Sequence, residues 1–260
     1  MDEYQLLNRK HGDYIQLVQL TDTHIFPDIE KDFDGVNTFE SLKHVINYAR
    51  QGNWPPDGIL LTGDLVHDPT AQAYKNLLSV LEEMDVPVIC LPGNHDSPDV
   101  MRNELNTGKI STKKLIVSDD WLIIMLDTVI ENTHSGRLAS SELELLDQYL
   151  QLHADKFSLI CLHHPPVKIG SPWMDAMGLE NSTDLFSIVD KHNHIKGILW
   201  GHIHQEFNSK YKDILLMAAP STCVQFKPGT DKYTKDDIPA GYRNIRLYCN
   251  GKIETEIVRI

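Results

Sequence analysis

The stretch "VICLPGNHD", residues 88–96, joins an apolar run typical of a buried strand to a turn that carries three polar side chains. Gly93 lets the backbone turn sharply, and Asn94, His95 and Asp96 can each bind a cation or take part in proton transfer. A single ending of this kind is explained equally well by an ordinary turn. A functional interpretation therefore depends on whether other apolar runs in the chain end in the same way.

Four further apolar runs end on the same kinds of side chain. They are "LVQLTDTHI" with Asp22 and His24, "ILLTGD" with Asp64, "LICLHHPP" with His163 and His164, and "GILWGHIH" with His202 and His204. Ligands of α/β folds bind outside the carboxyl ends of strands, so we expect these side chains to meet at one edge. Carboxylate, imidazole and amide groups without a thiolate favour a site for Mn, Fe, Zn or a similar cation.

Helical periodicity separates these strand-like runs. It predicts helices over residues 38–50, 71–84, 140–153 and 182–192, the first of them capped by Thr38. The last third contains no helical period, and "LYCNGKIETEI" places Asn250 and Gly251 between two alternating segments, which predicts a β-hairpin. The body is therefore expected to be α/β, with antiparallel strands added near the C-terminus.

Length and charge limit the classes of function. The 260 residues, 41% of them hydrophobic, suffice for one large domain or at most two small ones. A net charge of −13 argues against binding to nucleic acid or to an anionic membrane surface. It would also repel an anionic substrate unless metal ions reverse the local field.

The N-terminus and the cysteines indicate the compartment. "MDEYQLLNRKHGDY" lacks the apolar segment of a secretory signal, and no apolar run approaches the length of a membrane span. The 4 cysteines are widely separated, which favours buried thiols in a reducing environment over a disulfide framework. We therefore expect a cytoplasmic protein.

The five strand endings, taken in order, resemble those of the calcineurin-like metallophosphoesterase superfamily. "GVNTFESL", "SGRLASSELELLDQYL", "APSTCVQFKP", "AGYRNIRLY" and "GKIETEIVRI" resemble, more narrowly, the bacterial class III cyclic-nucleotide phosphodiesterase group. The resemblance implies a four-layer αββα sandwich of two mixed sheets flanked by helices, with a dinuclear metal site at the carboxyl ends of strands. It also implies one domain over residues 1–260, in which the strands of about 205–260 complete the second sheet.

The resemblance also implies roles for individual residues. One metal ion would be bound by Asp22, His24 and His204, the other by Asn94, His163 and His202, with Asp64 bridging both and His95 catalytic without binding metal. The substrate would contact His24, Asp64, Asn94, His95, His163 and His204. Fe or Mn is the expected metal, with Zn and Mg as alternatives. The motifs leave open whether His163 or His164 is the ligand, and whether His67, Asp68 or Asp96 supports the site. Asp68 or Asp96 could orient the ring of His95 or simply cap a turn.

The activity implied is hydrolysis of 3′,5′-cyclic AMP, with cyclic GMP as a second candidate, to the 5′-monophosphate. A metal-bridging hydroxide would attack phosphorus, and His95 would protonate the departing ribose oxygen. The partner would thus be a small cyclic nucleotide, with no nucleic acid and no membrane, and the protein a monomer or homodimer. Trp173, Met174 and Met177, within residues 171–182, could wall a pocket for the base or simply pack as a loop.

Two alternatives remain beside this interpretation. The same chemistry could act on another ester, such as a 2′,3′-cyclic nucleotide, a glycerophosphodiester, a lipid-linked nucleotide or a phosphomonoester, because the motifs fix only the phosphate. The chain could instead be a non-catalytic scaffold that binds a protein. Loss of ligand residues would be expected of a scaffold, and every expected ligand is present here.

Overall fold

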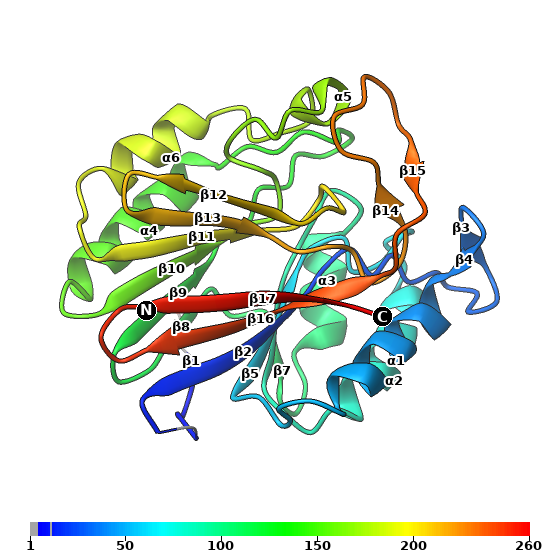
Figure 1. Ribbon diagram of the computed structural model, residues 1–260, viewed down its shortest axis with the longest axis horizontal. Helices are drawn as coiled ribbons and strands as arrows, with labels where there is room; N and C mark the ends of the chain where they lie inside the picture. The colour runs from blue at the N-terminus through cyan, green and yellow to red at the C-terminus, as the bar shows by residue number, and fades with distance from the viewer. Residues whose placement is uncertain (1–4, 11) are drawn as a thin grey trace.

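A computed structural model describes residues 5–10 and 12–260. Two β-sheets pack face to face, and helices cover the outer face of each sheet (Figure 1). The four-layer αββα arrangement expected from the resemblance is thereby confirmed. Residues 1–4 and 11, part of the stretch in which no signal sequence is expected, lie outside the described residues.

In the part of the chain that is described, one sheet has six strands in the order β17-β16-β2-β5-β6-β7. Strands β2, β5, β6 and β7 run parallel to one another. At one side of the sheet, β16 pairs antiparallel with β2, and β17 pairs antiparallel with β16. The strands are β2 (Tyr14–Leu20), β5 (Gly58–Thr62), β6 (Val88–Leu91), β7 (Ile110–Ser111), β16 (Gly241–Tyr248) and β17 (Ile253–Arg259).

The other sheet has seven strands among the described residues, in the order β1-β8-β9-β10-β11-β13-β12. Its centre, from β9 to β13, is parallel, while β8 and β12 each pair antiparallel with their inner neighbour. The strands are β1 (Gln5–Leu6), β8 (Leu115–Val117), β9 (Trp121–Met125), β10 (Phe157–Cys161), β11 (Ile195–Trp200), β12 (Phe207–Tyr211) and β13 (Ile214–Ala218).

Both faces of each sheet are buried, which explains why the central strands are continuous apolar runs. In β5, Ile59 and Leu61 pack with the helices, whereas Leu60 between them points into the space between the sheets. In β10, Ile160 packs toward the helices of its own sheet, and Leu159 contributes to the layer between the sheets. The strand period of two thus distributes one apolar run over two cores.

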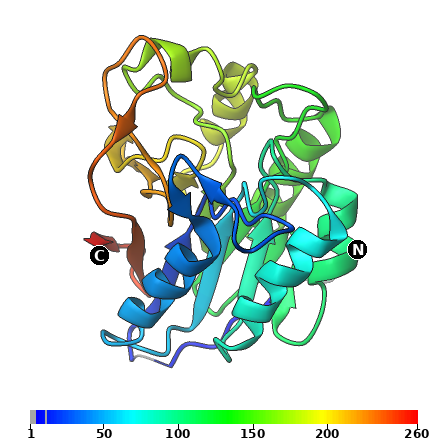
Figure 2. The ribbon, with the colours of Figure 1, turned by 90° about the vertical axis from the view of Figure 1, so that its right-hand side faces the viewer.

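The helices fall into two outer layers. α1 (Thr38–Ala49), α2 (Ala71–Glu82) and α3 (Pro98–Leu105) cover the six-stranded sheet, and Figure 2 shows α1 in blue and α2 in cyan in front of its strands. α4 (Ser140–Leu152) and α6 (Ser182–Val189) cover the seven-stranded sheet, and α5 (Pro172–Asp175) is a single short turn. The expectation that Thr38 caps α1 is wrong. The cap is Asn37, whose side chain accepts a hydrogen bond from the backbone of Glu40 at 2.9 Å.

The strands beyond residue 205 are divided between the two sheets instead of all joining one. β12 and β13 extend the seven-stranded sheet, and β16 and β17 form the predicted hairpin, which joins the other sheet beside β2. Two further hairpins, β3 (Asp32–Phe33) with β4 (Val36–Asn37) and β14 (Gln225–Phe226) with β15 (Lys235–Asp236), lie at the right in Figure 1. None of the helices in the described ranges is long and apolar enough to cross a bilayer.

Candidate metal centre

The five strand endings meet, as the sequence predicts. Three belong to the six-stranded sheet and two to the seven-stranded sheet, so the cluster straddles the carboxyl edges of both. The side chains follow β2 (Asp22, His24), β5 (Asp64), β6 (Asn94), β10 (His163) and β11 (His202, His204). All of them except Asn94 are buried, the most exposed being His202 at 5%.

The backbone at five of these positions is left-handed. The φ angles are 53° at Asp22, 45° at His24, 50° at Asp64, 67° at His202 and 50° at His204. This conformation costs a non-glycine residue roughly 1–2 kcal/mol. Such residues persist only where their surroundings constrain them, and they concentrate at functional sites. The strand endings are therefore not ordinary turns.

Close packing of these turns requires glycine at Gly93. A side chain there would overlap the Asp64 carboxylate and lie 2.7 Å from Nε2 of His163. The absence of a Cβ atom lets the turn after β6 approach the turn after β5 closely enough to bring Asn94 to the cluster.

Asp22, His24 and His204 form one group whose ligand atoms all lie within 4.8 Å of one another. Nε2 of His204 is 3.2 Å from Nε2 of His24 and 3.5 Å from a carboxylate oxygen of Asp22. Nδ1 of His204 donates to the carbonyl of Val224 at 2.7 Å. That bond fixes the ring so that Nε2 carries the lone pair, an arrangement typical of metal-binding histidines.

His163 and His202 belong to a second group, and Asn94 follows the neighbouring strand β6. Nε2 of His163 is 3.3 Å from Nδ1 of His202, and Nδ1 of His163 donates to the carbonyl of Thr62 at 2.8 Å. Oδ1 of Asn94 and Nε2 of His202 are buried without a hydrogen-bond partner in the structure. Unpartnered buried polar atoms are rare, and a cation would satisfy both of these.

Asp64 lies between the two groups. Its Oδ1 is 3.3 Å from Nε2 of His163, and its Oδ2 is 3.8 Å from Nε2 of His24. The two oxygens of one carboxylate thus face different histidine groups. The set of oxygen and imidazole donors fits a metal site, and its two halves share Asp64.

Burial and charge set the protonation of these groups. Burial lowers the pKa of His24, His202 and His204, in the last case to about 3, so these rings are neutral, as metal ligands must be. Burial also acts to lower the pKa of His163, but Asp64 outweighs it and raises that pKa to about 9.

The two adjacent histidines, equivalent in the sequence, differ in their partners. His163 lies against Asp64, whereas Nδ1 of His164 is 2.7 Å from the hydroxyl of Thr128 and its Nε2 is buried without a partner. His164 still lies close enough to His163 and His202 to form a third candidate group. The contact with the shared carboxylate favours His163 as the ligand.

Asp96 and His67 support the site in different ways, and Asp68 does not. The buried carboxylate of Asp96 accepts hydrogen bonds from the backbone of Leu65, at 3.0 Å, and of Gly93, at 2.8 Å, and so ties together two ligand-bearing turns. Asp68 is half-buried, and its carboxylate pairs with Lys31 at 3.7 Å.

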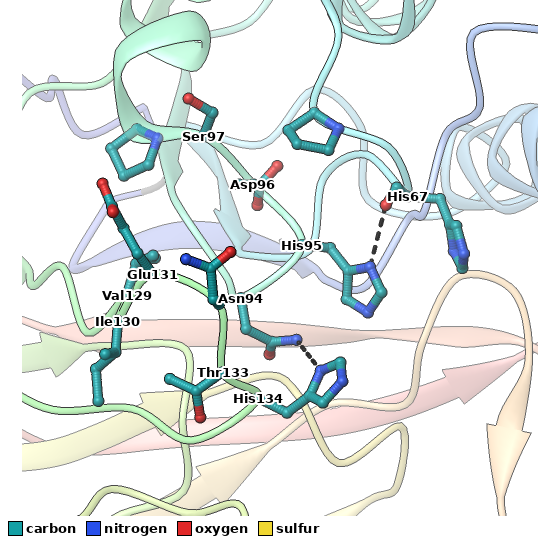
Figure 3. A pocket seen from close by; sticks show the side chains of 13 residues that line it. His67, Asn94, His95, Asp96, Ser97, Val129, Ile130, Glu131, Thr133 and His134 are labelled. Carbon is teal, nitrogen blue, oxygen red and sulfur yellow. Dashed lines mark hydrogen bonds between the residues drawn. The ribbon is translucent and has the colours of Figure 1, made fainter.

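The acceptor for the ring of His95 is the carbonyl of His67, 3.1 Å from Nδ1, and not a carboxylate (Figure 3). A backbone carbonyl therefore contacts this ring, and Asp96, which could orient the ring or cap a turn, instead accepts hydrogen bonds from the backbone of two turns. The ring of His67 stands beside those of His24 and His95, at centroid distances of 5.4 and 4.9 Å.

A cavity of about 220 Å³ opens onto the cluster. Five of the six expected substrate contacts line it, whereas His163 is fully buried and does not. The rest of its wall is mostly apolar and aromatic and includes Phe33, Trp173, Met174, Met177, Phe226 and Tyr233. Only Trp173, Met174 and Met177, which lie within residues 171–182, are predicted from the sequence as pocket residues. The others come from the β3–β4 and β14–β15 hairpins, whose sequences carry no periodic signal.

His134 is a further residue that the sequence analysis did not single out. It lies in the loop after β9 and lines the cavity, with Nδ1 3.2 Å from Nδ2 of Asn94 (Figure 3). Its position just before "SGRLASSELELLDQYL", in a polar loop that follows an apolar strand, was the available signal.

Comparison with known proteins agrees with this geometry. The sequence profile of the calcineurin-like phosphoesterase family matches residues 15–206. The chain is 36% identical over 247 residues to the 3′,5′-cyclic adenosine monophosphate phosphodiesterase CpdA of Haemophilus influenzae, covering 95% of this chain and 90% of that protein. It is 33% identical over 246 residues to the 3′,5′-cyclic-nucleotide phosphodiesterase alr5338 of a Nostoc species, covering 95% of this chain and 92% of that one.

Solved structures share the fold at low sequence identity. A dimetal phosphatase from Danio rerio superposes with a TM-score of 0.63 at 14% identity, covering 95% of this chain and 99% of that one. GAP50, the anchor in the inner membrane complex of Plasmodium, superposes with a TM-score of 0.67 at 13% identity, covering 95% and 85%. The cluster of candidate ligand residues at the strand ends agrees with these matches. The profile match and the near full-length relatives show that the chain belongs to the calcineurin-like phosphoesterase family.

Proposed function

We propose that this protein is a dinuclear-metal phosphodiesterase that hydrolyses 3′,5′-cyclic AMP to the 5′-monophosphate. The observation that carries the proposal is the pair of ligand groups on either side of Asp64, beside a cavity with an aromatic wall. The names of the curated relatives support the same substrate class.

The ligand assignment follows the two groups. Asp22, His24 and His204 would hold one cation, Asn94, His163 and His202 the other, and Asp64 both. Fe and Mn suit such oxygen and imidazole donors, with Zn and Mg as alternatives. Two cations in such a site activate water as a nucleophile and neutralise the phosphate oxygens. Neutralisation matters here because the chain has a net charge of −13.

His95 would act on the leaving group. Its backbone N–H donates to Asp64 at 2.9 Å, and its Nδ1 faces the carbonyl of His67, so Nδ1 carries a proton and Nε2 is left for the substrate. A neutral ring in this tautomer has no proton to give at Nε2. His95 would therefore act as an imidazolium that donates its Nε2 proton to the departing ribose oxygen.

The aromatic wall would hold the nucleobase. Trp173, Phe226 and Tyr233 contact one another edge to face, with centroids 5.2–5.7 Å apart, and Trp173 donates to the hydroxyl of Thr230 at 3.3 Å. Such side chains stack on any base, so cyclic GMP would be a second candidate substrate. A cavity lined by aromatic side chains as well as candidate ligand residues suits a nucleotide better than a bare phosphomonoester.

A second candidate is an acyclic phosphodiester such as a glycerophosphodiester. The observation that favours it is another cavity, of about 580 Å³, which shares Asn94, His95 and His134 with the first (Figure 3). A cyclic nucleotide carries both ester oxygens on one ribose, so it would occupy only one of the two cavities that His95 lines. An acyclic diester has a separate leaving alcohol, which this second cavity could receive.

A substrate screen with metal analysis of the same protein tests the proposal. We expect the Mn-loaded protein to convert 3′,5′-cyclic AMP to 5′-AMP with a higher kcat/KM than for glycerophosphodiesters, 2′,3′-cyclic AMP or nitrophenyl phosphate. A higher kcat/KM for a glycerophosphodiester would favour the second candidate. No hydrolysis of any ester by protein that carries two metal ions would favour the scaffold.

A further inference from the structure

Two proposed ligands have their backbone carbonyls held by hydroxyl groups that are remote in sequence. The hydroxyl of Ser221 donates to the carbonyl of Asp22 at 2.8 Å, and the hydroxyl of Thr38 donates to the carbonyl of His24 at 2.9 Å. Asp22 and His24 both have left-handed backbone, with φ of 53° and 45°. Each hydroxyl thus acts at a position that needs outside constraint.

Both hydroxyls are buried, Ser221 with 0% and Thr38 with 1% of its surface exposed. Water is therefore not available to replace either donor, and a carbonyl that loses its partner here pays a desolvation penalty. On the other side, the N–H of Asp22 donates to the carbonyl of Gly63 at 3.0 Å, and the N–H of His24 to that of Asp64 at 3.0 Å. Each ligand residue is consequently fixed through both its N–H and its carbonyl.

Two atoms of Cys223 contact the Ser221 hydroxyl. The N–H of Cys223 donates to Oγ of Ser221 at 2.9 Å, and Sγ of Cys223 lies 3.2 Å from the same oxygen, while the hydroxyl donates to the Asp22 carbonyl at 2.8 Å. The thiol of Cys223 adds a weak donor 3.3 Å from the same Asp22 carbonyl. The N–H of Thr222 pairs with the carbonyl of Thr21 at 3.1 Å, which aligns this turn with the end of β2.

Thr38 reaches His24 because it does not cap its own helix. Asn37 accepts the backbone N–H of Glu40, which leaves the Thr38 hydroxyl for another partner. The two donors approach from opposite parts of the chain. Thr38 begins α1, whereas Ser221 lies beyond residue 206, where the match to the family profile ends.

We infer that Ser221 and Thr38 form a hydroxyl clamp that holds Asp22 and His24 in the geometry needed to bind the first of the two cations. The inference rests on the proposed function, because it presumes a cation at Asp22, His24 and His204. Both are positioning residues, since their hydroxyls contact backbone carbonyls and neither lines the substrate cavity.

Calorimetric titration of the chelator-treated protein with Mn²⁺ tests the clamp without measuring activity. Wild-type protein should show two binding steps, and the step that disappears in His204→Ala reports the site held by the clamp. Thr38→Val and Ser221→Ala, which remove a hydroxyl and little volume, should each weaken that step about 10–100-fold and leave the other step unchanged. Thr38→Ser keeps the hydroxyl and should bind like wild type.

Ser158→Ala is the matched control, because Ser158 is fully buried and its hydroxyl has no hydrogen-bond partner in the structure. It should leave both binding steps intact. Thermal unfolding of each metal-free variant separates positioning from folding, since a purely structural role would lower the Tm and spare both steps. If Ser221→Ala does not fold, the Thr38→Val and Thr38→Ser pair still decides.

Three results would overturn the clamp. They are wild-type binding in both Thr38→Val and Ser221→Ala, equal weakening of both steps, and the same loss in Thr38→Ser or Ser158→Ala. A wild-type protein that binds no Mn²⁺ at all would overturn the proposed metal site along with it.

Discussion

Strand β11 is flanked by the same short pattern on both sides, and the two copies behave differently. "HNH", residues 192–194, precedes the strand, and "HIH", residues 202–204, follows it. His202 and His204 lie on left-handed backbone beside the carboxylate of Asp22 and belong to candidate cation groups. His192 instead pairs with Asp147 of α4 at 2.8 Å.

The difference shows what brings a His-x-His pair into a candidate metal group. Neither His192 nor His194 belongs to any candidate cation group in the described part of the chain, although a cavity of about 520 Å³ lies beside them. Spacing and nearby open space are therefore not sufficient. The carboxyl end of a strand brings neighbouring turns together, and the pair there meets carboxylates from other strands.

The largest expected effect comes from changing Asp64, the carboxylate that lies between the two candidate ligand groups. Asp64→Asn keeps the shape but lowers the negative charge between the two ligand groups, so we expect metal content well below two ions per chain and turnover of cyclic AMP at background. Elemental analysis and an assay of the same sample check this. Asp127→Asn is the control, since Asp127 also follows a strand but bonds the backbone of Val129 at 2.9 Å. Full metal content in Asp64→Asn would show that Asp64 is only a turn residue.

The next effect separates chemistry from metal binding at the same edge. His95→Ala should keep its metal and lose about 10²–10⁴ in turnover on cyclic AMP, the range for a lost general acid. The loss should be smaller on an ester with a nitrophenolate leaving group, which departs without a proton. Equal losses on the two esters would instead assign His95 to stabilising the phosphate oxygens. A fall in metal content would make it a ligand.

A smaller effect is expected at the aromatic wall. Stacking of a base on an aromatic side chain contributes about 1–3 kcal/mol. Trp173→Ala should therefore raise the KM for cyclic AMP about 5- to 150-fold, with little change for a nitrophenyl diester that has no nucleobase. An equal rise for both substrates would show that Trp173 supports the loop and does not contact the base.

The smallest effect is expected at the other His-x-His pair. His192→Ala removes a partly exposed ion pair with Asp147, which contributes about 0–1 kcal/mol to the free energy of unfolding. Metal content and kcat/KM should match those of wild type, as measured beside His204→Ala, which should lose one ion. A comparable loss in both variants would remove the distinction between the two ends of β11.

The sequence predicts the strands well, and it places the candidate ligand residues directly after them, because both follow from short-range patterns. The run at residues 14–20 is strand β2, and each ligand directly follows its strand. The remaining features depend on contacts between distant segments. The choice between His163 and His164 depends on which ring faces Asp64, and the role of Thr38 depends on a left-handed turn at His24 that no local pattern in this chain specifies.

The aromatic wall escapes prediction for the same reason. Phe33 and Tyr233 belong to polar loops without periodicity, and they become neighbours of the site only because two distant hairpins fold toward the same edge. His134 reaches Asn94 from a third loop. Apolar periodicity predicts the strands and helices. The walls of the cavity come instead from connecting segments, whose positions depend on how the strands and helices pack.

The most direct test of the proposed centre is a crystal structure of the Mn-loaded protein with anomalous diffraction data. We predict two anomalous peaks that share Asp64, one bounded by Asp22, His24 and His204 and the other by Asn94, His163 and His202. A single peak, a peak among His24, His67 and His95, or one at His192 and His194 with none at His202 and His204 would contradict the account.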